Sequence, residues 1–164
     1  MGISSDGILV FGINFDELNP FTHYISEEGY TEPREGFDED EEDPNEFDFE
    51  DLVVKHFSDL TEPEHITDET GRGVYGDDWK AYWGAKREVL ARVNVELVSH
   101  CSYEYPMYIL GIKESERTAY RGSPEKLGST IEAKPEWRLT LKDFCDRFDI
   151  KFEEPQWILA SIYG

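Results

Sequence analysis

The net negative charge of this chain is confined to its first half. The sequence has 37 acidic and 16 basic residues among 164, a net charge of −21. Residues 1–78 hold 24 acidic and 3 basic side chains, whereas residues 79–164 hold 13 of each, so the first half carries the whole imbalance. A field of this sign excludes bulk attraction to nucleic acid or to an anionic membrane. Its confinement also argues against a halophile's surface, where the acidity would be spread evenly.

The charge is densest in residues 27–51, which hold 14 acidic side chains and one basic residue, Arg34. Two interpretations of this segment stay open. A block of like charges is often a disordered, solvated loop. Self-repulsion, however, destabilises a compact chain, and almost no bases are present here to offset it. The concentration of charge therefore brings no folding benefit, which favours a binding role.

Apolar periodicity predicts a single domain, residues 1–164, of the α+β class. We expect a mixed or antiparallel sheet, about three helices, and the acidic segment 27–51 inserted as a loop. In the first strand, Gly12 is expected to mark a bulge or a close-packing point. The strands are predicted at residues 8–15, 95–101, 107–113, 118–121 and 157–163, with loops at 26–46 and 61–76.

Three segments have apolar residues at helical spacing. The first follows Asp43, a candidate cap, with Pro44 in the first turn, although its β-branched pair at 53–54 is also compatible with a strand. The second begins at residues 77–78 and extends to residue 93. The third covers about 139–148, where Thr140 and Asp143 resemble a capping box. The large aromatic residues expected in the core are Trp79, Tyr82, Trp83, Trp137 and Trp157.

No pattern of residues indicates catalysis or a metal site. The acidic run from residue 38 lacks the glycine of a calcium-binding loop, and the four histidines lack zinc spacing. No nucleophile elbow, P-loop or dinucleotide fingerprint occurs, and with 37 acids sequence spacing cannot select a catalytic pair. We therefore expect neither an enzyme nor a cofactor. Cys101 and Cys145 do not form a disulfide framework, and no secretory signal or membrane span is expected, so the cytoplasm is the predicted location.

The charge matches that of a length of DNA. Duplex DNA carries one negative charge per about 1.7 Å of axis, so a net charge of −21 corresponds to about 36 Å of duplex. A compact chain of this length has a diameter of about 40 Å, which gives a comparable line density. We predict that the chain mimics DNA and binds a basic nucleic-acid-binding protein, not nucleic acid or a membrane. The alternative is a structural or protein-interaction domain with a solvated acidic loop.

The residues predicted to contact the partner lie in the second part of the acidic segment. The acidic residues would replace phosphates, and the two phenylalanines would be anchors, since aromatic residues are frequent hot spots of interfaces. They are Asp38, Glu39, Asp40, Glu41, Glu42, Asp43, Glu46, Phe47, Asp48, Phe49, Glu50 and Asp51.

Three stretches of the sequence resemble small uncharacterised proteins encoded by bacteriophages and prophages. They are GISSDGILVFGI near the start, VELVSHCSYEYPMYILGI in the middle and EEPQWILASIYG at the end. The resemblance covers strand-like blocks, excludes the acidic segment, and carries over no catalytic residue. It implies a setting in which small acidic proteins inhibit host defences such as CRISPR or restriction nucleases. The predicted partner would then be a host defence protein in the host cytoplasm.

Overall fold

The computed structural model describes residues 5–35, 37, 48–67, 69, 72–102, 104–128 and 131–163. This part of the chain contains three α-helices and a mixed sheet, which confirms the predicted α+β class. The chain divides into two compact units: unit 1 comprises Met1–Asp43 and Val95–Gly164, and unit 2 comprises Pro44–Asn94. Compactness does not decide which parts fold independently, so the single domain over residues 1–164 stays a prediction.

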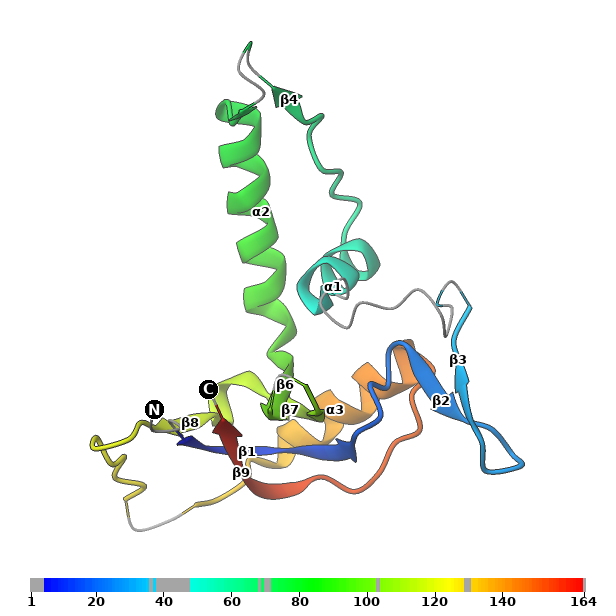
Figure 1. Cartoon of the computed structure of the whole chain (residues 1–164), viewed down its shortest axis with the longest axis vertical. Coiled ribbons are helices and arrows are strands. Elements are labelled where there is room, and N and C mark those ends of the chain that lie inside the picture. The colour runs from blue at the N-terminus through cyan, green and yellow to red at the C-terminus, as the bar shows by residue number, and fades with distance from the viewer. Residues whose placement is uncertain are drawn as a thin grey trace. The chain divides into compact units, whose positions relative to one another are not determined.

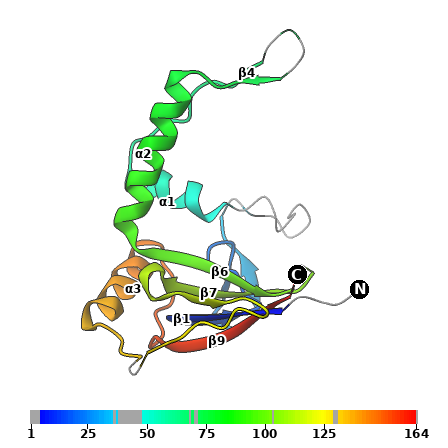
Figure 2. The same cartoon turned by 90° about the vertical axis from the view of Figure 1, so that its left-hand side faces the viewer.

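Unit 1 is built on a closed ring of four strands (Figures 1 and 2). β1 (Ser5–Asp16) pairs antiparallel with β9 (Gln156–Tyr163), and its end pairs antiparallel with β7 (Pro106–Ile112). β6 (Val95–Cys101) pairs antiparallel with β7 and meets β9 in a parallel bridge. Because β7 and β9 both pair with β1 as well, the strand pairings form a closed circuit, in which β6 and β9 meet at the single bridge between Cys101 and Ile162.

The core of this ring draws on all four strands. Ile8, Val10, Val98 and Ile109 are buried together, and Ile158, Ala160 and Ile162 pack against them. The ring is tight where β1 crosses β7, because a Cβ on Gly12 would lie 2.4 Å from the carbonyl oxygen of Leu110. This contact confirms the predicted close-packing role of Gly12.

A short 3₁₀ turn, η1 (Lys113–Ser115), allows one stretch of chain to pair twice with β1. β7 ends at the turn and β8 (Arg117–Ala119) follows it, pairing with the first half of β1. The buried hydroxyl of Ser115 accepts a hydrogen bond from the Phe11 N–H (2.9 Å) and donates one to the Ile112 carbonyl (2.6 Å). The turn therefore replaces the ladder hydrogen bonds that the strands lose there.

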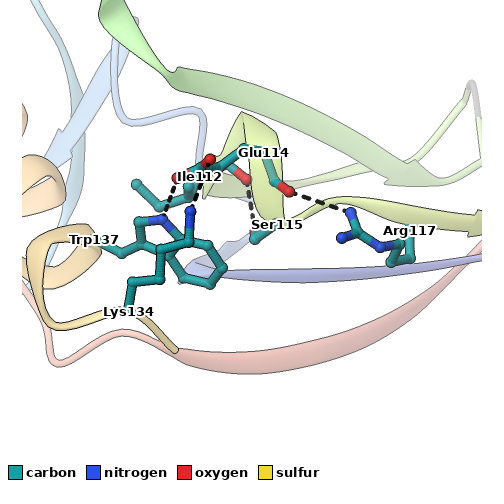
Figure 3. A network of polar contacts seen from close by, with 6 residues as sticks. All are labelled: Ile112, Glu114, Ser115, Arg117, Lys134 and Trp137. Atoms are coloured by element: carbon teal, nitrogen blue, oxygen red, sulfur yellow. Dashed lines mark hydrogen bonds and ion pairs between the residues drawn. The ribbon is translucent and has the colours of Figure 1, made fainter. Parts of the chain in front are cut away.

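Glu114 on this turn joins it to the helix α3 (Pro135–Arg147), as Figure 3 shows. Its carboxylate accepts hydrogen bonds from the Trp137 indole N–H (2.5 Å) and from Lys134 Nζ (3.1 Å). The Arg117 guanidinium donates to the backbone carbonyl of Glu114 (3.2 Å). These contacts fix the start of α3 against the strands.

The predicted start of α3 at residue 139 is wrong. The helix begins at Pro135, whose fixed φ suits the first helical position. Thr140 is therefore inside the helix and its hydroxyl donates to the Glu136 carbonyl (3.0 Å) instead of capping. Of the predicted apolar stripe, Leu141, Phe144 and Cys145 are buried, whereas Phe148 is half-buried and follows the last residue of the helix.

Part of the predicted loop at residues 26–46 is a hairpin. β2 (His23–Ile25) pairs antiparallel with β3 (Thr31–Pro33). Arg34, the one base of the acidic segment, follows β3 and donates hydrogen bonds to the carbonyls of Pro20 (2.9 Å) and Asp149 (2.8 Å). The arginine thus fastens the hairpin to the segment after α3.

Unit 2 consists of α1 (Phe49–Phe57), α2 (Asp77–Val93) and a small hairpin between them. The hairpin pairs β4 (Ile66–Thr67) with β5 (Gly73–Val74), so the expectation of loop alone at 61–76 is wrong. The predicted helix at 77–93 is confirmed. The two helices pack together, with Val53 and Val54 of α1 and Trp79 and Tyr82 of α2 buried. Within the described residues, no helix has the length and apolarity that a membrane span requires.

Candidate functional site

The structure describes four of the residues predicted to contact a partner. Asp48, Phe49, Glu50 and Asp51 lie at the start of α1. The others lie outside the described residues, as does the predicted helix cap Asp43 with Pro44; they are Asp38, Glu39, Asp40, Glu41, Glu42, Asp43, Glu46 and Phe47.

Three carboxylates gather at the N-terminus of α1. Asp48 is the N-cap, with extended backbone, and its side chain accepts a hydrogen bond from the Asp51 N–H (3.0 Å). Glu50 and Asp51 occupy the first turn. The unpaired N–H groups and the dipole of a helix favour negative charge at this end. These three acidic residues therefore have a folding role in addition to any binding role.

Asp51 also connects the two helices of unit 2. Its carboxylate forms a hydrogen-bonded ion pair with Lys86 of α2, whose side chain is buried. Burial by itself lowers the pKa of Lys86, but the hydrogen bond to Asp51 and the charges of Asp51 and Asp48 outweigh it, so the pKa is raised. The charge of Asp51 is thus balanced within the unit, whereas Asp48 and Glu50 are exposed to solvent.

The predicted anchor Phe49 is half-buried at the first position of α1. Part of the ring is therefore occupied by the protein itself, and part is accessible. A half-buried aromatic residue can both hold the helix and contact a partner, so its predicted role as an anchor stays a prediction.

A row of three aromatic residues in unit 2 reaches the surface, and the sequence assigned two of them, Trp79 and Trp83, to the core. We call Tyr75, Trp79 and Trp83, which recur every four residues, the aromatic ladder. The Tyr75 and Trp79 rings meet edge to face (centroids 5.3 Å apart), and Trp79 and Trp83 are stacked (6.0 Å). Trp79 is buried as predicted, but Trp83 is 46% exposed and Tyr75 is 61% exposed. The expected burial of Trp83 is wrong.

The physical reason for the exposure of Trp83 is that α2 buries a narrow stripe. The buried residues are Trp79, Tyr82 and Lys86, which follow one another at intervals of three and four. Trp83 lies one position further around the helix, next to Tyr82. The lysine in the apolar stripe was the sequence signal that this face is not a plain hydrophobic core.

Several carboxylates of unit 2 lie close enough to Tyr82 of α2 to affect its pKa. Burial raises the pKa of Tyr82, and the negative charges of Asp51, Glu62 and Asp48 add to the effect, while Lys86 opposes it. Two more aspartates, Asp77 and Asp78, form the first turn of α2 between Tyr75 and Trp79. Acidic residues therefore neighbour the aromatic residues of this unit in the sequence, and Asp51, Glu62 and Asp48 act on Tyr82 in the folded unit.

Unit 1 offers weaker candidates for chemistry. Burial raises the pKa of the Cys145 thiol to about 11, so this cysteine is a core residue and not a nucleophile. Glu96 faces Glu116, and burial together with that carboxyl raises its pKa to about 8. Across the parts of both units that the structure describes, no three His, Cys, Asp or Glu side chains are grouped to hold a metal ion.

Comparisons of the chain with protein-family models, with curated proteins and with solved structures give no match.

Proposed function

We propose that this chain is an acidic inhibitor that mimics the charge of DNA and binds a basic nucleic-acid-binding protein. The observation that carries the proposal is the placement of charge: residues 27–51 have a net charge of −13, while residues 79–164 are neutral. Long-range attraction would steer such a segment toward a positively charged groove, and salt would weaken the complex. In this mechanism the chain has no catalytic step and needs no cofactor.

The described end of the segment supports the proposal in part. Asp48 and Glu50 are exposed at the start of α1, so their charges are available to a partner. Asp51 contributes less, because Lys86 balances it. The binding role is therefore assigned chiefly to the acidic residues that precede α1 in the sequence.

The finer form of the proposal concerns the partner. The resemblance to phage-encoded proteins points to a host defence nuclease of the CRISPR or restriction type, which grips DNA in a basic channel. The second candidate function is an interaction domain whose acidic loop is only solvated. That candidate is favoured by the capping role of Asp48 and the internal pairing of Asp51, which explain these acidic residues without a partner.

A charge-matched pair of variants separates the two functions. In the first variant, the six acidic residues from Asp38 to Asp43 become Asn and Gln. In the second, the same number of exposed acidic residues in the neutral half is replaced. These are Glu88, Glu104, Glu125, Glu132, Asp143 and Glu153.

Each variant is used as bait in a bacterial lysate over a series of salt concentrations, and captured proteins are tested for displacement by duplex DNA. We expect the parent and the second variant to capture a basic protein that DNA displaces, and the first variant to lose it. Equal capture by both variants would establish that the acidic loop is only solvated.

A further inference from the structure

The aromatic ladder presents two rings to solvent on a fixed support. Trp79, in the middle, is 6% exposed, and it holds Tyr75 on one side and Trp83 on the other. The Tyr75 ring is also fixed from the hairpin: it meets His65 edge to face (6.1 Å), and a Cβ on Gly73 would lie 3.2 Å from it. Exposed aromatic rings held in place by buried neighbours lose little entropy on binding.

One of these rings already contacts a cation. Lys86 Nζ lies 5.2 Å from the centroid of the Trp83 ring. The negative face of an indole attracts a positive charge, and tryptophan does so more strongly than the other aromatic residues. Lys86 therefore already lies beside one part of the Trp83 ring, and the exposed part of the ring is what remains for a partner.

The segment that carries the start of the ladder is acidic. Residues 61–79 hold six acidic side chains and one basic residue, Arg72. Asp77 and Asp78 are exposed and lie between Tyr75 and Trp79 in the sequence. Nucleic-acid bases also stack on aromatic rings, but their phosphates would be repelled here.

Exposed rings in an acidic segment match the chemistry of arginine. A guanidinium group is planar and stacks on aromatic faces, and its N–H groups bind carboxylates in pairs. An ammonium group has no plane to stack, although it is attracted by the same charges. The surface should thus distinguish arginine from lysine.

We propose that the aromatic ladder binds arginine side chains of the basic partner, and that the net negative charge of residues 61–79, with the exposed Asp78, attracts the same guanidinium groups. This inference rests on the proposed function, since it assumes a basic partner, and it adds a second contact surface to the acidic segment. The charged loop steers the partner, and the ladder selects arginine.

The test compares an oligo-arginine peptide with an oligo-lysine peptide of the same length, titrated into the full chain by calorimetry. We expect the parent to bind oligo-arginine more tightly. The variants Tyr75→Ala and Trp83→Ala should each weaken oligo-arginine binding about two- to fivefold, the range of an exposed cation–π contact. Binding of oligo-lysine should change less, so the preference is lost when both rings are removed.

Tyr120→Ala is the matched control, because Tyr120 is 62% exposed, as Tyr75 is, but lies in unit 1. It should leave both affinities unchanged, and circular dichroism checks that every variant is folded. Equal binding of the two peptides by the parent, or ladder variants that keep the preference, would overturn the ladder while leaving the acidic segment as the binding site.

Two further results would also overturn the ladder. If neither peptide binds even at low salt, the proposed function fails together with the inference. If Trp83→Ala instead abolishes self-association of the chain, measured by sedimentation, the ladder is an interface between copies and not an arginine site.

Discussion

Lys86 and Asp51 form an ion pair in which one partner is buried and the other is not. The lysine side chain is 7% exposed and the aspartate side chain 57% exposed. Lys86 lies in the apolar stripe of α2, so its charge is compensated by Asp51. The exposed carboxylate of Asp51, by contrast, is also stabilised by solvent. This asymmetry makes the effect of removing each partner different.

Asp51→Asn should lower the free energy of unfolding by about 1–3 kcal/mol, because it leaves the buried ammonium group of Lys86 without its counter-charge. The matched control is Asp77→Asn, which breaks the ion pair with Lys80 (2.9 Å), where both side chains are exposed. That change should cost less than about 1 kcal/mol. Urea denaturation of both variants measures the difference, and equal effects would show that Lys86 does not depend on Asp51.

Gly12→Ala should destabilise unit 1 by about 1–3 kcal/mol, the usual cost of overpacking. The added Cβ would lie 2.4 Å from the Leu110 carbonyl oxygen and 2.9 Å from the Gly111 Cα, so the backbone of one of the two strands has to shift. Gly7→Ala on the same strand is the control, since nothing lies within 4 Å of its Cβ. Thermal unfolding should separate the two variants. If both unfold at the parent's temperature, the strands are not held as close as the structure has them.

Gly84→Ala should stabilise the chain by about 0.5–1 kcal/mol. Gly84 lies in the middle of α2, where glycine is a poor helix former, and nothing lies within 4 Å of an added Cβ. The gain in stability is measured as a higher urea concentration at the midpoint of unfolding, with an unchanged dependence of the free energy on urea concentration. A loss of stability instead would mean that this face of α2 is covered.

The sequence predicted the elements whose signals are local. Alternating or periodic apolar residues located β1, β6, β7, β9 and α2 to within two or three residues. The closure of the ring has no such signal, because it depends on pairing between residues far apart, such as Gly12 with Gly111. The misplaced start of α3 shows a competition between two local rules, in which Pro135 at the first turn prevailed over Thr140 as a cap.

The candidate site was predictable in its charge but not in its aromatic part. The net charge of residues 27–51 is a property of composition. The exposure of Trp83, by contrast, depends on which residues of α2 face α1. An aromatic residue at helical spacing gives the same sequence pattern whether it is buried or at the edge of a buried stripe. The folded unit resolves that ambiguity, because Trp79, Tyr82 and Lys86 form the buried stripe and Trp83 lies beside it.

Glu96 should make unit 1 less stable as the pH rises through neutrality. Burial, and then the hydrogen bond to Glu116 and its charge, raise the pKa of Glu96 from 4.5 to about 8 in the folded chain. Between pH 4.5 and about pH 8, Glu96 has lost its proton in the unfolded chain but still holds it in the folded chain. The folded state is therefore favoured at low pH, and this stability is lost as the pH rises from about 4.5 to about 8.

Glu96→Gln isolates this contribution, since glutamine keeps the shape of the protonated acid and does not titrate. As the pH rises from acidic to weakly alkaline, the transition temperature of the parent should fall relative to that of the variant. The fall should be about 2–4 °C for each 1 kcal/mol of stability lost. Glu116→Gln should move the shift to lower pH, because it removes the charge that opposes ionisation of Glu96. Glu104→Gln, an exposed carboxylate of the same unit, is the control. A parent and a Glu96→Gln variant with parallel profiles would show that Glu96 ionises at its ordinary pKa, and that the two carboxyl groups do not share a proton.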